Sequence, residues 1–155
     1  MSQREGLRIR SANRTDRAAA VRIAGDAMIA YGIEPDFAGL DSDLGSLGAN
    51  PKACAELVVT IDGAVAGVAV LSYWDDNAGK LTGFYVDPEW RGQGIGSALL
   101  ARATDAGRAA GFSRLHLETW HFMQAAIHLY ERANWKRGLD PVPGSGADRT
   151  YDLIL

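Results

Sequence analysis

The order of elements in residues 81–120 constrains the fold of this chain more than any other feature. Residues 81–86, LTGFYV, are rich in aromatic and β-branched residues and predict a strand. A glycine-rich turn follows, and apolar residues then recur at helical spacing before a second strand at residues 114–120. A strand–helix–strand unit of this kind forms a right-handed crossover between parallel strands. The unit therefore predicts helices packed against a sheet.

The residues before this unit predict antiparallel strands. Residues 56–61 and 65–74 are β-rich, and the Asp62-Gly63 pair between them is a strong signal for a two-residue hairpin turn. A further strand is expected at residues 7–12, and the last strands are expected at the carboxyl end of the chain. Because hairpins precede the crossover, the sheet is expected to be mixed and mostly antiparallel.

Helical periodicity predicts three long helices, and their inner faces are expected to carry Val21, Ala24, Met28 and Tyr31, then Ile95, Ala98, Leu99, Ala103 and Ala106, and then Phe122, Ala126, Leu129, Tyr130 and Ala133. Asn134 fits a left-handed cap after the last of them. Residues 32–51 are acidic and interrupted by Gly and Pro, which predicts a short or broken helix and an exposed loop. The pattern as a whole predicts one α+β domain over residues 1–155, with about six or seven strands and about four flanking helices.

Composition limits the classes of partner. The formal net charge is -3 with acids and bases interspersed, so nucleic acid and anionic membranes are not expected partners. No apolar run approaches the length of a membrane span, and the amino terminus has no apolar signal segment. The single cysteine, Cys54, excludes an internal disulfide and has no nearby histidine to activate it. We expect a cytoplasmic protein with no metal site.

The turn at residues 91–96, RGQGIG, has the chemistry of an anion site, because a helix start presents unpaired N–H groups and glycines let an anion approach the backbone. The nucleotide P-loop is excluded, since it requires a Gly-Lys-Ser/Thr sequence. A dinucleotide fingerprint fits only as Gly92-x-Gly94-x-x-Ser97, with Glu118 as the ribose acid. That fit is disfavoured because five residues separate the strand from Gly92 and the preceding strands are antiparallel.

The pattern Arg91-x-x-Gly94-x-Gly96 resembles the acyl-CoA signature of the GNAT acetyltransferase superfamily. The surrounding FYVDPEWRGQGIG and the later AAIHLYERANW are also similar to segments of that family, as is the order of predicted elements along nearly the whole chain. The resemblance implies an acetyl-CoA-dependent N-acetyltransferase that transfers the acetyl group directly to a primary amine in a ternary complex. It implies cofactor contacts at Phe84, Tyr85, Val86, Arg91, Gly92, Gln93, Gly94, Ile95, Gly96 and Ser97.

The resemblance also implies two catalytic candidates. Tyr130 matches the position of a tyrosine whose hydroxyl protonates the departing thiolate, and a packed core tyrosine is the alternative. Glu118 matches a glutamate that acts as base through water, and a structural carboxylate is the alternative. His116, His121 or water alone remain open as the base. The family often has Asn where this chain has Met123, so a contact near the acetyl group is lost or replaced.

The acceptor side is expected at the first helix, the acidic segment, the late strands and the loop at residues 141–148, with Tyr31, Trp74 and Trp120 as candidate contacts. Acidic and aromatic residues there favour a cationic amine, either a small amine or amino acid derivative or the amino terminus of a peptide. A non-catalytic acyl-CoA-binding module and a dinucleotide-dependent oxidoreductase are the alternatives from other classes. The sequence leaves open whether the protein is a monomer or a homodimer.

Overall fold

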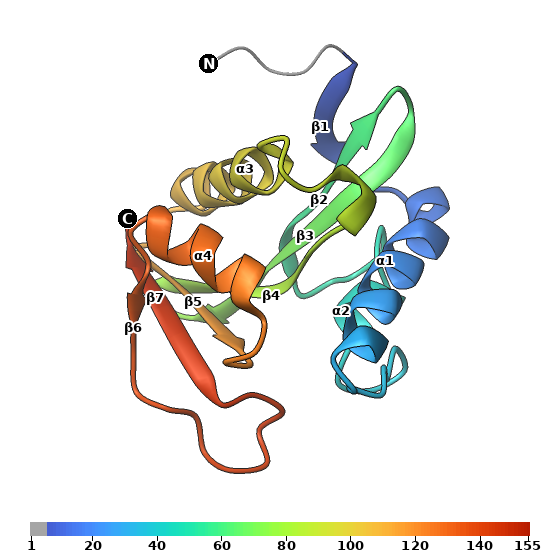
Figure 1. The fold of residues 1–155 in the computed structure, drawn as a ribbon. Helices are drawn as coiled ribbons and strands as arrows, with labels where there is room; N and C mark the ends of the chain where they lie inside the picture. The colour runs from blue at the N-terminus through green and yellow to red at the C-terminus, as the bar shows by residue number, and fades with distance from the viewer. Residues whose placement is uncertain (1–5) are drawn as a thin grey trace.

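The computed structural model describes residues 6–155 (Figure 1). Its strands are β1 (Leu7–Ser11), β2 (Ala53–Ile61), β3 (Ala64–Asp75), β4 (Ala78–Val86), β5 (Arg114–Thr119), β6 (Lys136–Arg137) and β7 (Arg149–Ile154). Its helices are α1 (Arg17–Ala30), α2 (Ser42–Gly45), α3 (Ile95–Ala109) and α4 (Gln124–Arg132), with short 3-10 turns at Arg14–Asp16 and Pro88–Trp90.

The strands form one sheet in the order β1-β2-β3-β4-β5-β7-β6. Among the strands described, β4 and β5 alone are parallel neighbours, and α3 makes the crossover between them; the other neighbours are antiparallel. The β2–β3 hairpin turns at Asp62 and Gly63, both of which have positive φ angles, of 50° and 87°. Such angles at both central residues are those of the tight hairpin turn that the sequence predicts. The predicted mixed, mostly antiparallel α+β fold is confirmed.

Both faces of the sheet are covered by helices. One face carries α1 and α2 and the other carries α3 and α4 (Figure 1). Alternate residues of the central strands enter the two cores: Val58 and Val68 pack with α1 and α2, whereas Val59 and Leu71 pack with α3 and α4. Burial of both faces explains why the sequences of β2 and β3 contain nearly continuous apolar runs. No helix within residues 6–155 has the length and apolarity needed to cross a bilayer.

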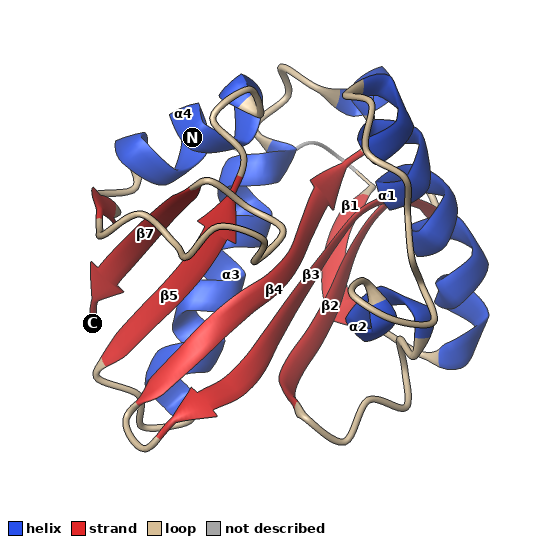
Figure 2. Cartoon of the chain, turned by 90° about the horizontal axis from the view of Figure 1, so that it is seen from below, coloured by secondary structure: helices blue, strands red, loops and turns tan. Residues whose placement is uncertain are grey.

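The parallel pairing of β4 and β5 is short. It covers only Ala78–Lys80 against Arg114–His116, and the two strands then diverge (Figure 2). The β3–β4 register shifts at this point, since Leu71 pairs with Leu81 while its neighbour Val70 pairs with Gly83. A bulge bends its strand and increases the local twist. The bulge at Thr82 therefore turns the end of β4 away from β5.

Two local expectations are corrected. The short helix predicted in the acidic segment is present as α2, but the segment is not simply exposed, because Leu44 and Leu47 are buried against α1 and the sheet. The last long helix begins at Gln124 rather than at Phe122, which lies in the preceding turn. Asn134 has a φ angle of 70°, and its predicted left-handed conformation is confirmed.

Leu99 provides a test of the packing between α3 and the sheet. Its side chain is fully buried, so Leu99→Ala is expected to lower the free energy of unfolding by about 2–5 kcal/mol, measured by urea denaturation. Leu139→Ala is the control, because Leu139 is 90% exposed, and its effect is expected to stay within about 0.5 kcal/mol. Equal effects of the two substitutions would contradict this packing.

Candidate functional site

A cavity of about 510 Å³ lies where the end of β4 meets the start of α3; we call it the first cavity. Nine of the ten residues predicted to contact a cofactor line it: Phe84, Tyr85, Val86, Arg91, Gly92, Gly94, Ile95, Gly96 and Ser97. Gln93 does not line the cavity, although both of its neighbours do. The structure therefore brings the strand end and the glycine turn to one place.

The start of α3 is shaped for an anion. Gly94 is the residue before the helix, has a left-handed φ of 76° and provides no side chain to cap the first turn. Gly92 is also left-handed, with a φ of 79°. A Cβ at Gly96 would lie 2.6 Å from Leu129 Cδ1, so glycine allows α3 and α4 to approach closely. The uncapped N–H groups and the helix dipole can bind a phosphate group here.

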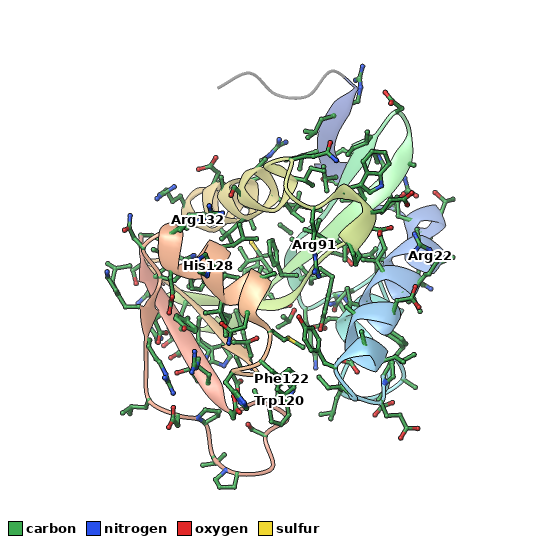
Figure 3. All side chains as sticks on the ribbon, in the orientation of Figure 1. Arg22, Arg91, Trp120, Phe122, His128 and Arg132 are labelled. Atoms are coloured by element: carbon green, nitrogen blue, oxygen red, sulfur yellow. The ribbon has the colours of Figure 1, made fainter. Side chains whose placement is uncertain are left out.

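The charged residues of the first cavity are both basic. Arg91 follows the 3-10 turn and Arg132 ends α4, and no carboxylate of residues 6–155 lines the cavity with them. In Figure 3, Arg91 lies between the ribbons of α1 and α4. The other lining residues are largely apolar. This combination favours a ligand with phosphate groups and an extended uncharged arm.

A second cavity, of about 520 Å³, lies on the acceptor side predicted from the sequence. Its walls come from the end of α1, from α2 and the segment before it, from β4, β5 and α4, and from the loop before β7 at Ser145, Gly146 and Ala147. The charged residues that line it are Glu34, Asp41, Asp43, Glu118 and Lys80. The second cavity is thus acidic, whereas the first is basic.

The two cavities meet at the diverging end of β4. Phe84, Tyr85, Met123 and Ala126 line both of them. Met123 stands where the family often has Asn, and its sulfur accepts a hydrogen bond of 3.5 Å from the Thr119 hydroxyl. Two ligands, one bound in each cavity, would therefore meet at these residues.

Tyr130 lies beside this meeting point and lines the second cavity. Only 5% of the residue is exposed, and its ring packs 5.8 Å from that of Phe84. Burial raises the pKa of Tyr130 well above that of an ordinary tyrosine, with a smaller contribution from Tyr85. Its hydroxyl has no hydrogen-bond partner among residues 6–155. Tyr130 is therefore a protonated, unengaged donor at neutral pH.

Tyr85 connects Tyr130 electrostatically with the acidic segment. Burial, and then the negative charge of Asp41, raise the pKa of Tyr85 to about 12. Tyr85 in turn contributes to the raised pKa of Tyr130. The Asp41 carboxylate is thus close enough to Tyr85 to raise its pKa.

Glu118 faces the second cavity and forms an ion pair with Lys80. The Lys80 ammonium donates to Glu118 Oε2 at 2.5 Å, and both side chains are about three-quarters buried. The other oxygen, Oε1, has no partner in the described part of the chain. Glu118 is therefore anchored through one oxygen and can accept a hydrogen bond through the other.

The alternative bases and the cysteine lie elsewhere. His116 Nδ1 hydrogen-bonds Asp152 at 2.9 Å, and His121 pairs with Asp148 on the surface; neither histidine lines these two cavities. Burial raises the pKa of the free Cys54 thiol, which disfavours a nucleophilic thiolate. Within residues 6–155, no group of three or more His, Cys, Asp or Glu side chains is arranged to hold a metal ion.

The three aromatic residues predicted on the acceptor side lie in three different places in the structure. Trp120 lines the second cavity, and Tyr31 lines the first. Trp74 lines neither of these two cavities, and its predicted contact with the acceptor stays a prediction. Its ring stacks on His116, with 4.2 Å between centroids, and the Arg114 guanidinium lies over it at 5.2 Å. Trp74 therefore lies where β4 and β5 are still paired, away from their diverging ends.

Several residues of the site were missed from the sequence. Phe122 contacts both Tyr31 and Trp120, with ring centroids 5.3 and 5.6 Å apart, and so connects the end of α1 with the loop after β5. Figure 3 shows Trp120 and Phe122 together near the start of α4. Arg132 and Lys80 were also missed. No sequence motif marks them, because their places depend on the packing of α4 and on the strand register.

Comparison with known proteins identifies the family. The model of the acetyltransferase (GNAT) family matches residues 25–135. The chain belongs to this family. It is 35% identical over 126 residues to a streptothricin acetyltransferase from Streptomyces lavendulae, a match that covers 78% of this chain but only 66% of that relative.

Solved structures show the same fold. A GNAT acetyltransferase from Staphylococcus aureus Mu50 aligns with a TM-score of 0.84 at 17% identity, covering 96% of this chain and 99% of that one. The acetyltransferase yncA from Salmonella typhimurium, solved with acetyl-CoA, aligns with a TM-score of 0.77 at 21% identity, covering 97% and 95%. These GNAT neighbours agree with the mixed sheet and its flanking helices.

The unengaged hydroxyl of Tyr130 has a consequence for stability. Tyr130→Phe is expected to change the free energy of unfolding by less than about 0.5 kcal/mol, because no hydrogen bond is lost. Tyr151→Phe is the matched control: Tyr151 is also buried, but its hydroxyl donates to Glu131 at 2.8 Å, so a loss of about 0.5–1.5 kcal/mol is expected. Thermal and urea unfolding measure both, and a larger loss for Tyr130→Phe would show that its hydroxyl is engaged.

Proposed function

We propose that this protein is an acetyl-CoA-dependent N-acetyltransferase that transfers the acetyl group directly to the primary amine of a small molecule. The observation that carries the proposal is the meeting of a basic cavity and an acidic cavity at Phe84 and Tyr85, at the diverging end of β4. An anionic donor and a cationic acceptor would enter from opposite sides and touch there. Membership of the GNAT family supports the same reaction.

The first cavity fits coenzyme A. The uncapped start of α3 and its left-handed glycines would bind the pyrophosphate, with Arg91 and Arg132 adding positive charge. The edge of β4 beyond Lys80 has no strand partner on the β5 side, so its backbone is available to the pantetheine amides. When bound, acetyl-CoA supplies an acetyl group activated as a thioester.

Two proton transfers accompany the reaction. As the amine nitrogen bonds to the acetyl carbon and the carbon–sulfur bond breaks, the nitrogen must lose a proton and the sulfur must gain one. In this proposal Glu118 Oε1 accepts the amine proton through water, and the other oxygen is held by Lys80. Tyr130 donates to the sulfur in this proposal, which its protonated hydroxyl supports because it has no other partner in the structure described.

The donor assignment predicts a charge-dependent affinity. Arg91→Ala and Arg132→Ala are each expected to weaken coenzyme A binding about fivefold at low salt, with smaller losses at high salt. Isothermal titration calorimetry measures this, and Arg102→Ala is the control because Arg102 is exposed on α3 and lines neither cavity. The assignment fails if all three variants bind coenzyme A like the wild type.

The catalytic role proposed for Tyr130 predicts that its substitution lowers turnover without weakening acetyl-CoA binding. Tyr130→Phe is expected to lower kcat about 10- to 1,000-fold, in the range of a lost general acid, with acetyl-CoA affinity within about twofold of wild type. Release of free coenzyme A is followed with small amines, amino acids and peptides as acceptors. Acetyl-CoA binding without thiol release from any acceptor would instead support the non-catalytic module, and peptide-only release would support an amino-terminal acetyltransferase.

A further inference from the structure

The carboxylates of the second cavity are largely without cationic partners. Glu118 is paired with Lys80, but no cation of the described residues pairs with Glu34, Asp41 or Asp43. Neutral donors orient two of them: Asp41 accepts from the backbone N–H of Asp36, and Asp43 accepts from the Asn50 amide. These hydrogen bonds fix the carboxylates in place without neutralising their charge.

A second observation indicates that a ligand belongs in this cavity. Tyr130 is a polar side chain that is 95% buried, it lines the cavity, and its hydroxyl has no partner within residues 6–155. It marks the reacting end. Asp41 and Asp43 line the same cavity as Tyr130. An acceptor bound here therefore contacts both the hydroxyl and the acidic wall.

Unpaired carboxylates are a disadvantage for an acceptor with a single amine. Nearby negative charge favours the ammonium form, whereas the attacking nitrogen must be neutral. A second positive charge on the acceptor removes this conflict, because one ammonium pairs with the acidic wall while the other nitrogen loses its proton and reacts. The apolar residues Met28, Ile33 and Leu40 line the same side and suit a hydrocarbon chain between the two nitrogens.

We infer that the acceptor is a small dication, a diamine or a basic amine with a second protonated nitrogen, and that Asp41 and Asp43 hold its non-reacting charge. This inference rests on the proposed acetyl transfer and names its substrate class. The cavity of about 520 Å³ is of the size that takes small organic ligands. Trp120 lines the same cavity, and an aromatic ring can attract a cationic nitrogen.

The test compares 1,4-diaminobutane with 4-amino-1-butanol, which has the same length but only one positive charge. We expect wild-type kcat/KM to be at least about tenfold higher for the diamine at low salt. In the variant Asp41→Asn/Asp43→Asn, this ratio is expected to fall to about one, with a rise in KM for the diamine. Asp76→Asn is the control, because Asp76 is an exposed acid outside both cavities, and its ratio should stay at the wild-type value.

Binding is measured in parallel by calorimetry on the protein saturated with coenzyme A, so that the inference is tested even without turnover. Tighter binding of the diamine that is lost in the double variant supports it. The inference is overturned if the wild type shows a diamine-to-amino-alcohol ratio near one, or if the preference for the diamine survives in the double variant. In that case, release of free coenzyme A with the amino alcohol would still support the proposed acetyl transfer. A peptide amine that outperforms every diamine would also overturn it.

Discussion

The divergence of β4 from β5 is the constraint on which the rest of the site depends. The parallel ladder stops at Lys80 and His116, and the bulge at Thr82 bends β4 immediately afterwards. Without it, the backbone edge near Phe84 would be occupied by β5, and the two cavities would have no common wall. The helices on the two faces then supply what each side needs: α3 brings an uncapped start to one side, and the segment between α1 and α2 brings carboxylates to the other.

Charge is divided across this strand. Arg91 and Arg132 make one side basic, and four carboxylates against one lysine make the other acidic, although the chain as a whole carries a net charge of only -3. Opposite potentials favour an anionic ligand in one cavity and a cationic ligand in the other. The buried, neutral Tyr130 lines the second cavity, where a charged acid would be costly to desolvate.

Local chemistry was predicted well from the sequence. The hairpin at Asp62-Gly63, the left-handed Asn134 and the glycine turn before α3 all depend on backbone preferences of a few adjacent residues. The acidic character of residues 32–51 was also evident, but the burial of Leu44 and Leu47 within that segment was not. The place of Trp74 at the paired end of the strands was not evident either, because it follows from register, which the sequence of one strand does not contain.

The sequence by itself determined the order of the elements and the anion-binding turn, since both follow from short-range propensity and from the freedom of glycine to adopt positive φ. Only the tertiary structure decided which carboxylates share a cavity and which tyrosine lies beside it. The Lys80–Glu118 pair joins residues 38 positions apart, and the opening between β4 and β5 arises from a bulge in a different strand pair. Such contacts depend on register and helix packing, which are set by the burial of the whole core and not by any single segment.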